Sequence, residues 1–248
     1  MCGRYASTAR RADLLEQFQI DDDKADEPNG PDYNVAPTKL APVVISRALL
    51  DGPKDAAAVR QLRLFKWGLI PFWAKDTRIG NRLVNARSET VHEKPAFRAA
   101  FKSRRCLIPV DAFYEWFETD KLSEKTHKPF KQPFAFRPID GSSLALAGVY
   151  EVWKDKSLPE DDPASLLRSY TIITTTATDE IGRIHDRMPM AIAPDDWDLW
   201  LDPTVKDPAD VKALMSPPTG LEIYAVSTAV NDVRRNNGPH LLDPLPAS

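Results

Sequence analysis

Residues 143–153, SLALAGVYEVW, and residues 169–178, SYTIITTTAT, decide the fold, because both stretches are rich in apolar and β-branched side chains. Such side chains fit the half-buried, pleated surface of a sheet, so each stretch predicts a strand. Residues 154–165, KDKSLPEDDPAS, separate them with charges and prolines, which is typical of a solvated loop. The chain is therefore expected to be rich in β-structure.

The rest of the chain extends this pattern. The segment VRQLRLFKW at 59–67 alternates apolar and polar residues, which predicts a half-buried strand. A helix over residues 8–19 is expected to start at a Ser7 or Thr8 cap. Further strands are expected at 3–6, 41–46, 106–110, 111–117 (with Pro109 separating these last two), 133–138 and 221–227, and short helices at 194–202 and 209–215.

These elements predict a mixed α/β (α+β) fold in a single domain over residues 1–248. The sheet should be mostly antiparallel, with flanking helices. The core should span about residues 2–230, and the tail at about 231–248 is expected to be coil.

Composition excludes several classes of protein. With 248 residues, 42% hydrophobic and 28% charged, the chain can bury a sizeable core and does not have the composition of a disordered protein. No stretch reaches the roughly 18 apolar residues of a membrane span, and the N-terminus lacks the apolar region of a secretory signal. We therefore expect a cytoplasmic protein, nucleoid-associated if bacterial. Two cysteines and four scattered histidines favour neither a disulfide framework nor a metal site, and no cofactor is expected.

The charge distribution says more than the net charge of −3. A negative total argues mildly against a nucleic-acid-binding protein. Electrostatic fields depend on patches, however, and arginines concentrate in a few segments that could share one basic face. These segments are TARR (8–11), RIGNRLVNAR (78–87), FRAAFKSRRC (97–106) and DVRRNN (232–237).

Cys2 is the first candidate for chemistry, because the chain begins MCGRYAS. If Met1 is removed, Cys2 carries an α-amine and a thiol on adjacent carbons. The α-amine of an ordinary N-terminus has a pKa of about 7.7–8.0, so part of it is neutral at pH 7 and can attack an aldehyde to form a Schiff base. The neighbouring thiol can then close a five-membered thiazolidine. The alternative is that a small residue follows methionine by chance.

Glu115 and His185 are candidate proton-transfer groups. Glu115 lies between Phe113 and Phe117 on one strand face, so its carboxylate should be partly desolvated and its pKa raised, which suits a general acid or base. The alternative is a solvated glutamate on an edge strand. His185 lies in IGRIHDRMPM, where Asp186 and other charged neighbours can set its protonation state, or it is a structural histidine.

Other candidates carry weaker signals. Asn85 could position a substrate or serve as a turn residue, and Cys106 fits plain burial within RRCLIPV. No G-x-S-x-G, P-loop, G-x-G-x-x-G or H-E-x-x-H motif is present. Several arginines could bind phosphates or be solvated, and several aromatic residues could stack on bases or belong to the core: Arg4, Arg78, Arg82, Arg87 and Arg187, and Trp67, Phe72, Trp73 and Trp116.

Six motifs taken in order are far more specific than any of these residues alone. They are MCGRYA (1–6), YNVAPT (33–38), WGLIPFW (67–73), NARSET (85–90), RRCLIPVDAFYEW (104–116) and IHDRMP (184–189). With this series, from Cys2 to about Val230, the chain strongly resembles the SOS-response-associated peptidase (SRAP) family of abasic-site processing proteins.

The resemblance implies an SRAP-type domain with Cys2 as mature N-terminus and covalent nucleophile. The implied partner is single-stranded DNA containing abasic sites, held in a basic groove by a monomer, with replication-fork protein partners unknown. The implied reaction joins Cys2 to the aldehyde of the ring-opened abasic site as a thiazolidine DNA–protein crosslink. The family is also associated with abasic-site lyase activity and with peptidase removal of its own N-terminus.

The resemblance also implies roles for individual residues. Asn85 matches the residue that positions the N-terminal cysteine, Glu115 the acid/base carboxylate and His185 the histidine of the same site. The DNA-binding positions implied are Arg4, Trp73, Arg87, Trp116, Thr174 and Arg187, with Thr174 near the reaction centre. Two rival functions are an N-terminal-nucleophile cysteine peptidase acting on proteins and a non-covalent binding module for modified DNA bases.

Overall fold

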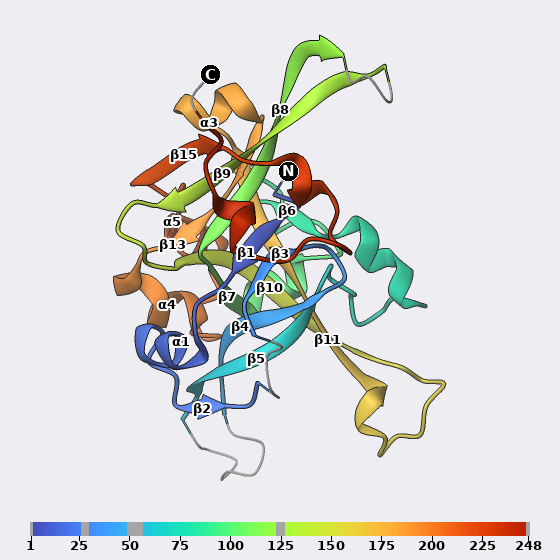
Figure 1. Cartoon of the computed structure of the whole chain (residues 1–248). Helices are drawn as coiled ribbons and strands as arrows, with labels where there is room; N and C mark the ends of the chain where they lie inside the picture. Colours follow the sequence, from blue (N-terminus) through green and yellow to red (C-terminus); the bar gives the residue numbers. More distant parts are fainter. Residues whose placement is uncertain (1, 26–29, 49–56, 123–126, 247–248) are drawn as a thin grey trace.

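The computed structural model describes residues 2–25, 30–48, 57–122 and 127–246, and its strands form two sheets (Figure 1). The smaller sheet has the strand order β15 (Leu221–Ala225), β9 (Pro129–Pro138), β8 (Ala112–Leu122), β1 (Tyr5–Ser7) and β3 (Asp32–Val35). The larger sheet has the order β12 (Arg187–Pro189), β11 (Leu166–Thr176), β5 (Val59–Trp67), β4 (Leu40–Arg47), β7 (Arg105–Val110), β10 (Leu144–Lys154), β13 (Ala191–Ile192) and β14 (Met215–Ser216), with β2 (Asp22–Asp23) beside β5 and β6 (Asn85–Arg87) beside β11.

The helices are short and flank the sheets. The α-helices are α1 (Arg11–Gln17), α2 (Arg98–Ser103), α3 (Asp179–Ile184), α4 (Trp197–Leu201) and α5 (Pro208–Ala213). The 3-10 helices are η1 (Thr77–Arg82), η2 (Pro163–Ser165), η3 (Pro194–Asp196), η4 (Thr228–Asn231) and η5 (Pro239–Leu242). Within the part of the chain described, no helix is long and apolar enough to cross a bilayer.

The two stretches that decide the fold close a ring of strands. β10 and β11 pair antiparallel, from Gly148 opposite Ile172 to Lys154 opposite Leu166. β11 also pairs with β5, and the order β5–β4–β7–β10 completes the circuit. Most pairings among the described strands are antiparallel; β11 runs parallel to β5 and β6, and β2 runs parallel to β5. The predicted α+β, mostly antiparallel, strand-rich fold is confirmed.

Side chains alternate across this ring and build two cores. Along β7, Cys106 and Ile108 face one core, whereas Leu107 faces the other. The first core lies between the two sheets and includes Tyr5, Trp67, Phe113, Phe136, Tyr170 and Ile172. The second lies under the helices and includes Leu14, Phe18, Phe101, Leu107, Trp197 and Trp200. The period of two is what a sheet buried on both faces requires.

A third core covers the outer face of the smaller sheet, and it corrects the prediction for the tail. Residues 231–248 were expected to be coil, yet η5 forms within them and Leu241 is fully buried. Leu241 packs with Val226 and Val230 against Ala112 and other small-sheet residues. The tail itself has too few apolar residues for its sequence pattern to predict this contact. The smaller sheet supplies the other half of this core.

Other boundaries differ for identifiable reasons. Helix α1 begins at Arg11, after an Arg10 N-cap whose side chain makes no capping hydrogen bond, so the predicted Ser7 or Thr8 cap is wrong. The Thr8 hydroxyl and backbone amide instead donate hydrogen bonds to the Asp111 carboxylate. Pro109 lies inside β7 and pairs with Ala145, so it does not separate the two strands. Elements β3, β6, α2 and α3 were not predicted.

Arg105 joins two helix ends to the larger sheet, and its removal should destabilise the protein. Its buried guanidinium donates to the carbonyl oxygens of Phe101, Lys102, Trp200 and Asp202. Arg105→Met keeps an apolar stem but leaves these carbonyls without their donors, so we expect a loss of about 3 kcal/mol in the free energy of unfolding, measured by urea denaturation.

The matched control is Arg10→Met, which removes an exposed arginine paired with Asp13. Exposed ion pairs contribute little, so its denaturation midpoint should stay close to that of the unchanged protein. Equal midpoints for both variants would show that the four carbonyl contacts do not stabilise the fold.

Candidate active site

A pocket of about 570 Å³ lies at the seam between the two sheets. The larger sheet contributes residues of β6, β11 and β12, and the smaller sheet contributes β8 and β9. Its lining residues are Asn85, Arg87, Glu115, Trp116, Lys131, Thr174, His185, Asp186 and Arg187. Seven of these were predicted as site residues from motifs far apart in the sequence, and the fold brings them together.

Cys2 lies beside this pocket, fully buried in the core between the sheets. The Asn85 side-chain amide donates to the Cys2 carbonyl oxygen at 2.8 Å, so β6 fixes the chain just before β1 begins. β6 is itself held by parallel pairing with β11 and by the Trp67 indole, which donates to the Val84 carbonyl oxygen at 2.8 Å. The cysteine therefore has a fixed position relative to both sheets.

The Cys2 thiol is held in its neutral form. Burial raises the pKa of this thiol far above its ordinary value, and the negative charge of Glu115 raises it further. A reactive cysteine usually has a lowered pKa, set by nearby positive charge. At neutral pH the sulfur of Cys2 is therefore a protonated thiol rather than a thiolate.

Glu115, which the sequence predicted as a candidate proton-transfer group, is buried in β8. Burial raises its pKa from 4.5 to about 7. The prediction that the aromatic strand would desolvate this carboxylate and raise its pKa is confirmed. At neutral pH both protonation states of Glu115 are populated, which is the condition that favours a general acid/base.

His185 is the C-cap that follows α3. Because α3 packs against β8, the imidazole lies near Glu115. The His185 Nε2 atom lies 3.8 Å from Glu115 Oε2. The Arg187 backbone amide donates to His185 Nδ1 at 3.0 Å, and Asp186 Oδ1 lies 2.9 Å from the same nitrogen. Burial is the main cause that lowers the His185 pKa. In the neutral ring Nδ1 accepts from Arg187, so Nε2 carries the proton that faces Glu115.

Arg187 and Arg4 were predicted as DNA-contacting residues, and both are engaged inside the protein. Arg187 binds both carboxylate oxygens of Glu89, at 2.7 and 3.0 Å, and donates to the Thr174 carbonyl oxygen at 2.6 Å. This pairing lowers the pKa of Glu89 to about 2. Thr174 is buried against β6, and its hydroxyl lies 3.5 Å from the Ala86 carbonyl oxygen. Arg187 thus braces the wall of the pocket.

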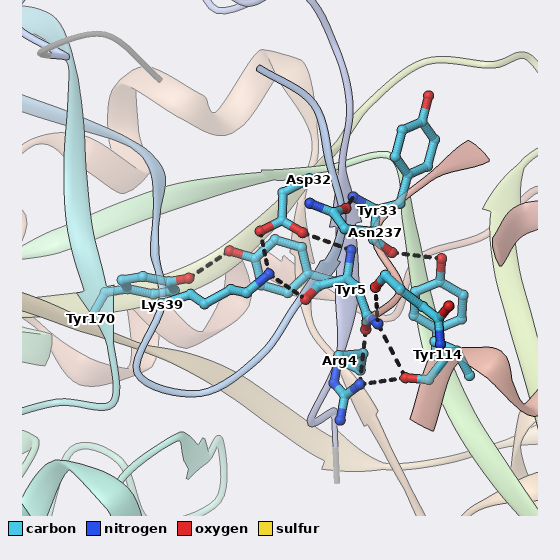
Figure 2. Close-up of polar contacts among 11 residues, drawn as sticks. Arg4, Tyr5, Asp32, Tyr33, Lys39, Tyr114, Tyr170 and Asn237 are labelled. Atoms are coloured by element: carbon cyan, nitrogen blue, oxygen red, sulfur yellow. Dashed lines mark hydrogen bonds and ion pairs between the residues drawn. The ribbon is translucent and has the colours of Figure 1, made fainter. Parts of the chain in front are cut away.

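Arg4 joins the smaller sheet to the C-terminal segment, as Figure 2 shows. It donates to Asn34 Oδ1 at 2.8 Å and to the Val230 carbonyl oxygen at 2.6 Å. Its guanidinium also lies over the Trp116 ring, 5.7 Å from the ring centroid. Arg4 therefore packs on the ring of Trp116, which lines the pocket.

Trp73, like Cys2 and Arg4, is a predicted residue that does not line the pocket. It is 49% exposed in the connection from β5 to β6, next to the still more exposed Phe72. At the base of this connection, Gly68 has φ +108 and its backbone lies against Gly80, where a side chain would clash. Lys131, which lines the pocket, and Glu89, which binds Arg187, were not predicted from the sequence, because charged side chains carry no periodic signal. Asp186 also lines the pocket, and it was named only as a charged neighbour of His185.

The sequence profile of the family described as SOS response associated peptidase (SRAP) matches residues 1–233. This chain belongs to the SRAP family. The SRAP chain is 38% identical over 245 residues to abasic site processing protein YoqW of Bacillus subtilis strain 168, covering 98% of this chain and 99% of the relative. It is 31% identical over 268 residues to abasic site processing protein HMCES of Xenopus tropicalis, covering 98% of this chain and 78% of that one.

A solved structure shares the SRAP chain's fold. A protein from Bacteroides thetaiotaomicron superposes with a TM-score of 0.77 at 22% identity, over 98% of this chain and 100% of that chain. At this identity the likeness concerns the fold alone.

The raised pKa of Glu115 makes the stability of the SRAP chain depend on pH. The buried carboxyl keeps its proton up to about pH 7, whereas the unfolded chain releases it near pH 4.5. The stabilisation from this group is therefore complete below about pH 4.5 and is lost as the pH rises through about 7. Glu115→Gln has no proton to lose, so its stability relative to the unchanged protein should increase by about 3 kcal/mol between these pH values.

The measurement is urea denaturation of both proteins across this pH range. Parallel stability curves would mean that the Glu115 carboxylate is solvated in the folded protein.

Proposed function

We propose that this protein recognises abasic sites in single-stranded DNA and joins them covalently to Cys2. The observation that carries the proposal is the pocket in which Asn85, Glu115 and His185 meet beside Cys2. Membership of the SRAP family and relatives named abasic site processing proteins support it. The protein is proposed to act as a monomer.

The reaction requires a free amine on Cys2, and therefore hydrolysis of the Met1–Cys2 peptide bond; Met1 lies outside the described residues. The amine lone pair attacks C1′ of the ring-opened abasic-site aldehyde. The carbonyl oxygen leaves as water after proton transfers, which gives a C=N Schiff base. The sulfur then adds to C1′, the C=N electron pair moves to nitrogen, and the thiol proton ends on that nitrogen. The product is a thiazolidine, and no oxidant or reductant is needed.

The protonation states favour the amine as first nucleophile. Burial and Glu115 keep the thiol protonated, whereas an ordinary N-terminal amine is partly neutral at pH 7. A cysteine peptidase would need a thiolate activated by a base, and the raised pKa of the Cys2 thiol opposes that. The neutral thiol carries the proton that ring closure must place on nitrogen.

Glu115 and His185 are proposed to move the protons. With a pKa of about 7, Glu115 can give a proton to the departing oxygen and take one from the attacking amine. When His185 is protonated on both ring nitrogens, it can return the Nε2 proton to the Glu115 carboxylate and become the neutral imidazole. Asn85 holds the Cys2 carbonyl and so fixes the direction of the amine.

Contacts to the DNA are proposed to come from the exposed side chains at the pocket. Arg87 lines it and is exposed, so its guanidinium can reach a phosphate. Trp116 and the partly exposed Trp73 are proposed to stack on bases. Arg4 and Arg187 are proposed to hold the pocket walls. Where ring closure fails, the Schiff base could lead to strand cleavage, the proposed lyase activity, and removal of Met1 is the proposed peptidase activity.

Three forms of the N-terminus test the order of attack. Cys2→Ala keeps the amine but loses the sulfur, so it should give a Schiff base that borohydride traps, without a stable thiazolidine. A form with one residue retained before Cys2 has an amide in place of the amine and should give neither product. Wild-type protein should give a crosslinked band on a denaturing gel only with DNA that contains an abasic site.

Each rival function predicts a different gel. If the blocked form crosslinks and Cys2→Ala does not, the thiol acts first and the amine-first mechanism is wrong. A non-covalent module for modified bases gives no band that survives denaturation, and a peptidase acting on proteins needs no DNA.

Glu115→Gln tests proton transfer. The amide keeps the shape of the side chain but cannot exchange a proton, so the single-turnover rate of crosslinking should fall by about 10²–10⁴-fold. The affinity for unreactive single-stranded DNA should hold, because Glu115 is buried below the surface that phosphates contact. A wild-type rate for this variant would remove Glu115 from the reaction.

A further inference from the structure

Lys131 is one of the exposed charged residues that line the pocket. It lies on β9 and lines the pocket, and 60% of its side chain is solvent-exposed. No motif singled it out. Its charge also contributes, after burial and other causes, to lowering the pKa of His185, which lines the same pocket.

Lys131 and Arg87 line the same pocket from different sheets. Arg87 belongs to β6 of the larger sheet, and Lys131 to β9 of the smaller sheet. Among the described residues none forms an ion pair with Arg87, whereas Arg187 is bound to Glu89. Two accessible cations, one from each sheet, therefore line the pocket and can bind phosphates of a strand that runs through it.

Lys131 is held by one partner that a phosphate could replace. Its Nζ atom lies 3.2 Å from Glu118 Oε2, and these residues are directly opposite each other on β9 and β8. Glu118 is 58% exposed, so water and salt weaken this pair.

We propose that Lys131 binds a phosphodiester of single-stranded nucleic acid at the pocket, and that Glu118 holds the Lys131 ammonium until the phosphate displaces it. The inference rests on the proposed function for the identity of the strand. It assigns Lys131 a binding role and no part in the covalent step. Glu118 lowers the affinity, because the phosphate must compete with its carboxylate.

The test measures binding of an unreactive single-stranded oligonucleotide, without an abasic site, by fluorescence anisotropy at several salt concentrations. Lys131→Gln should weaken binding and reduce the slope of log affinity against log salt by about 0.7, the value for one phosphate contact on a single strand. Between about 50 and 200 mM salt, the affinity ratio of wild type to Lys131→Gln should therefore fall by about 2.6-fold. Duplex DNA and inorganic phosphate as competitors show whether the site prefers the flexible strand.

The role of Glu118 is tested by a double-mutant cycle. Glu118→Gln should tighten binding when Lys131 is present and should have no effect in the Lys131→Gln background. If Glu118→Gln tightens binding equally in both backgrounds, Glu118 repels the strand independently of Lys131. The proposed competition between Glu118 and a phosphate for Lys131 is then wrong. The matched control is Lys154→Gln, which breaks the ion pair between Lys154, at the end of β10, and Glu160. Neither residue lines the pocket.

The control variant should keep the wild-type affinity and salt slope. If Lys154→Gln weakens binding as much as Lys131→Gln, the effect is one of net charge and the assignment fails. Crosslinking by the wild-type protein separates this inference from the proposed function. Crosslinking by wild type with unchanged binding by Lys131→Gln would overturn only this inference, whereas Lys131-dependent binding without any crosslink would overturn only the proposed function.

Discussion

The two sheets are tied together by a buried contact of aromatic side chains on which the candidate site depends. The hydroxyls of Tyr5, in β1, and Tyr170, in β11, are hydrogen-bonded at 2.5 Å (Figure 2). Trp67 packs against both rings, with ring centroids 5.1 Å from Tyr5 and 6.3 Å from Tyr170. Two hydroxyls can be buried here because each satisfies the other.

Each of these three residues is close in sequence to a part of the site. Tyr5 follows Cys2 by three residues, and Tyr170 precedes Thr174 on the same strand. Trp67 ends β5, and its indole holds the segment that leads into Asn85. Residues that the sequence separates widely therefore take fixed positions relative to one another. Such preorganisation is needed to bring an amine and an aldehyde together.

The same burial that orders the site also sets its protonation states. Glu115 would be charged and the Cys2 thiol closer to ionisation in water, but desolvation raises both pKa values. It lowers the pKa of His185. All three shifts favour the neutral forms of these groups. This state suits a condensation in which protons move among amine, oxygen and sulfur, and it opposes chemistry that begins from a thiolate.

The sequence predicted what local patterns determine and missed what distant partners determine. The alternation in residues 59–67 gave β5 with its observed bounds, and the aromatic neighbours of Glu115 predicted its desolvation. Asn85, in contrast, was open to interpretation as a turn residue, because the strand that holds it exists only through pairing with β11. The helix α3 that carries His185 to Glu115 gave no signal at all. The family resemblance, not periodicity, pointed to these residues as a set.

Arginines show the limit of sequence reasoning most clearly. Arg4, Arg87 and Arg187 all lie in motifs and all resembled phosphate ligands, yet burial divides their roles. A buried guanidinium must find acceptors within the protein, and Arg187 finds them in Glu89, 98 residues away. Only an exposed cation keeps its hydrogen-bonding capacity for a ligand, as Arg87 does. Burial is a property of the fold, so only the structure shows whether a cation binds within the protein or stays available to a ligand. The cations available to a ligand are therefore found on the surface of the pocket, and not by membership of a motif.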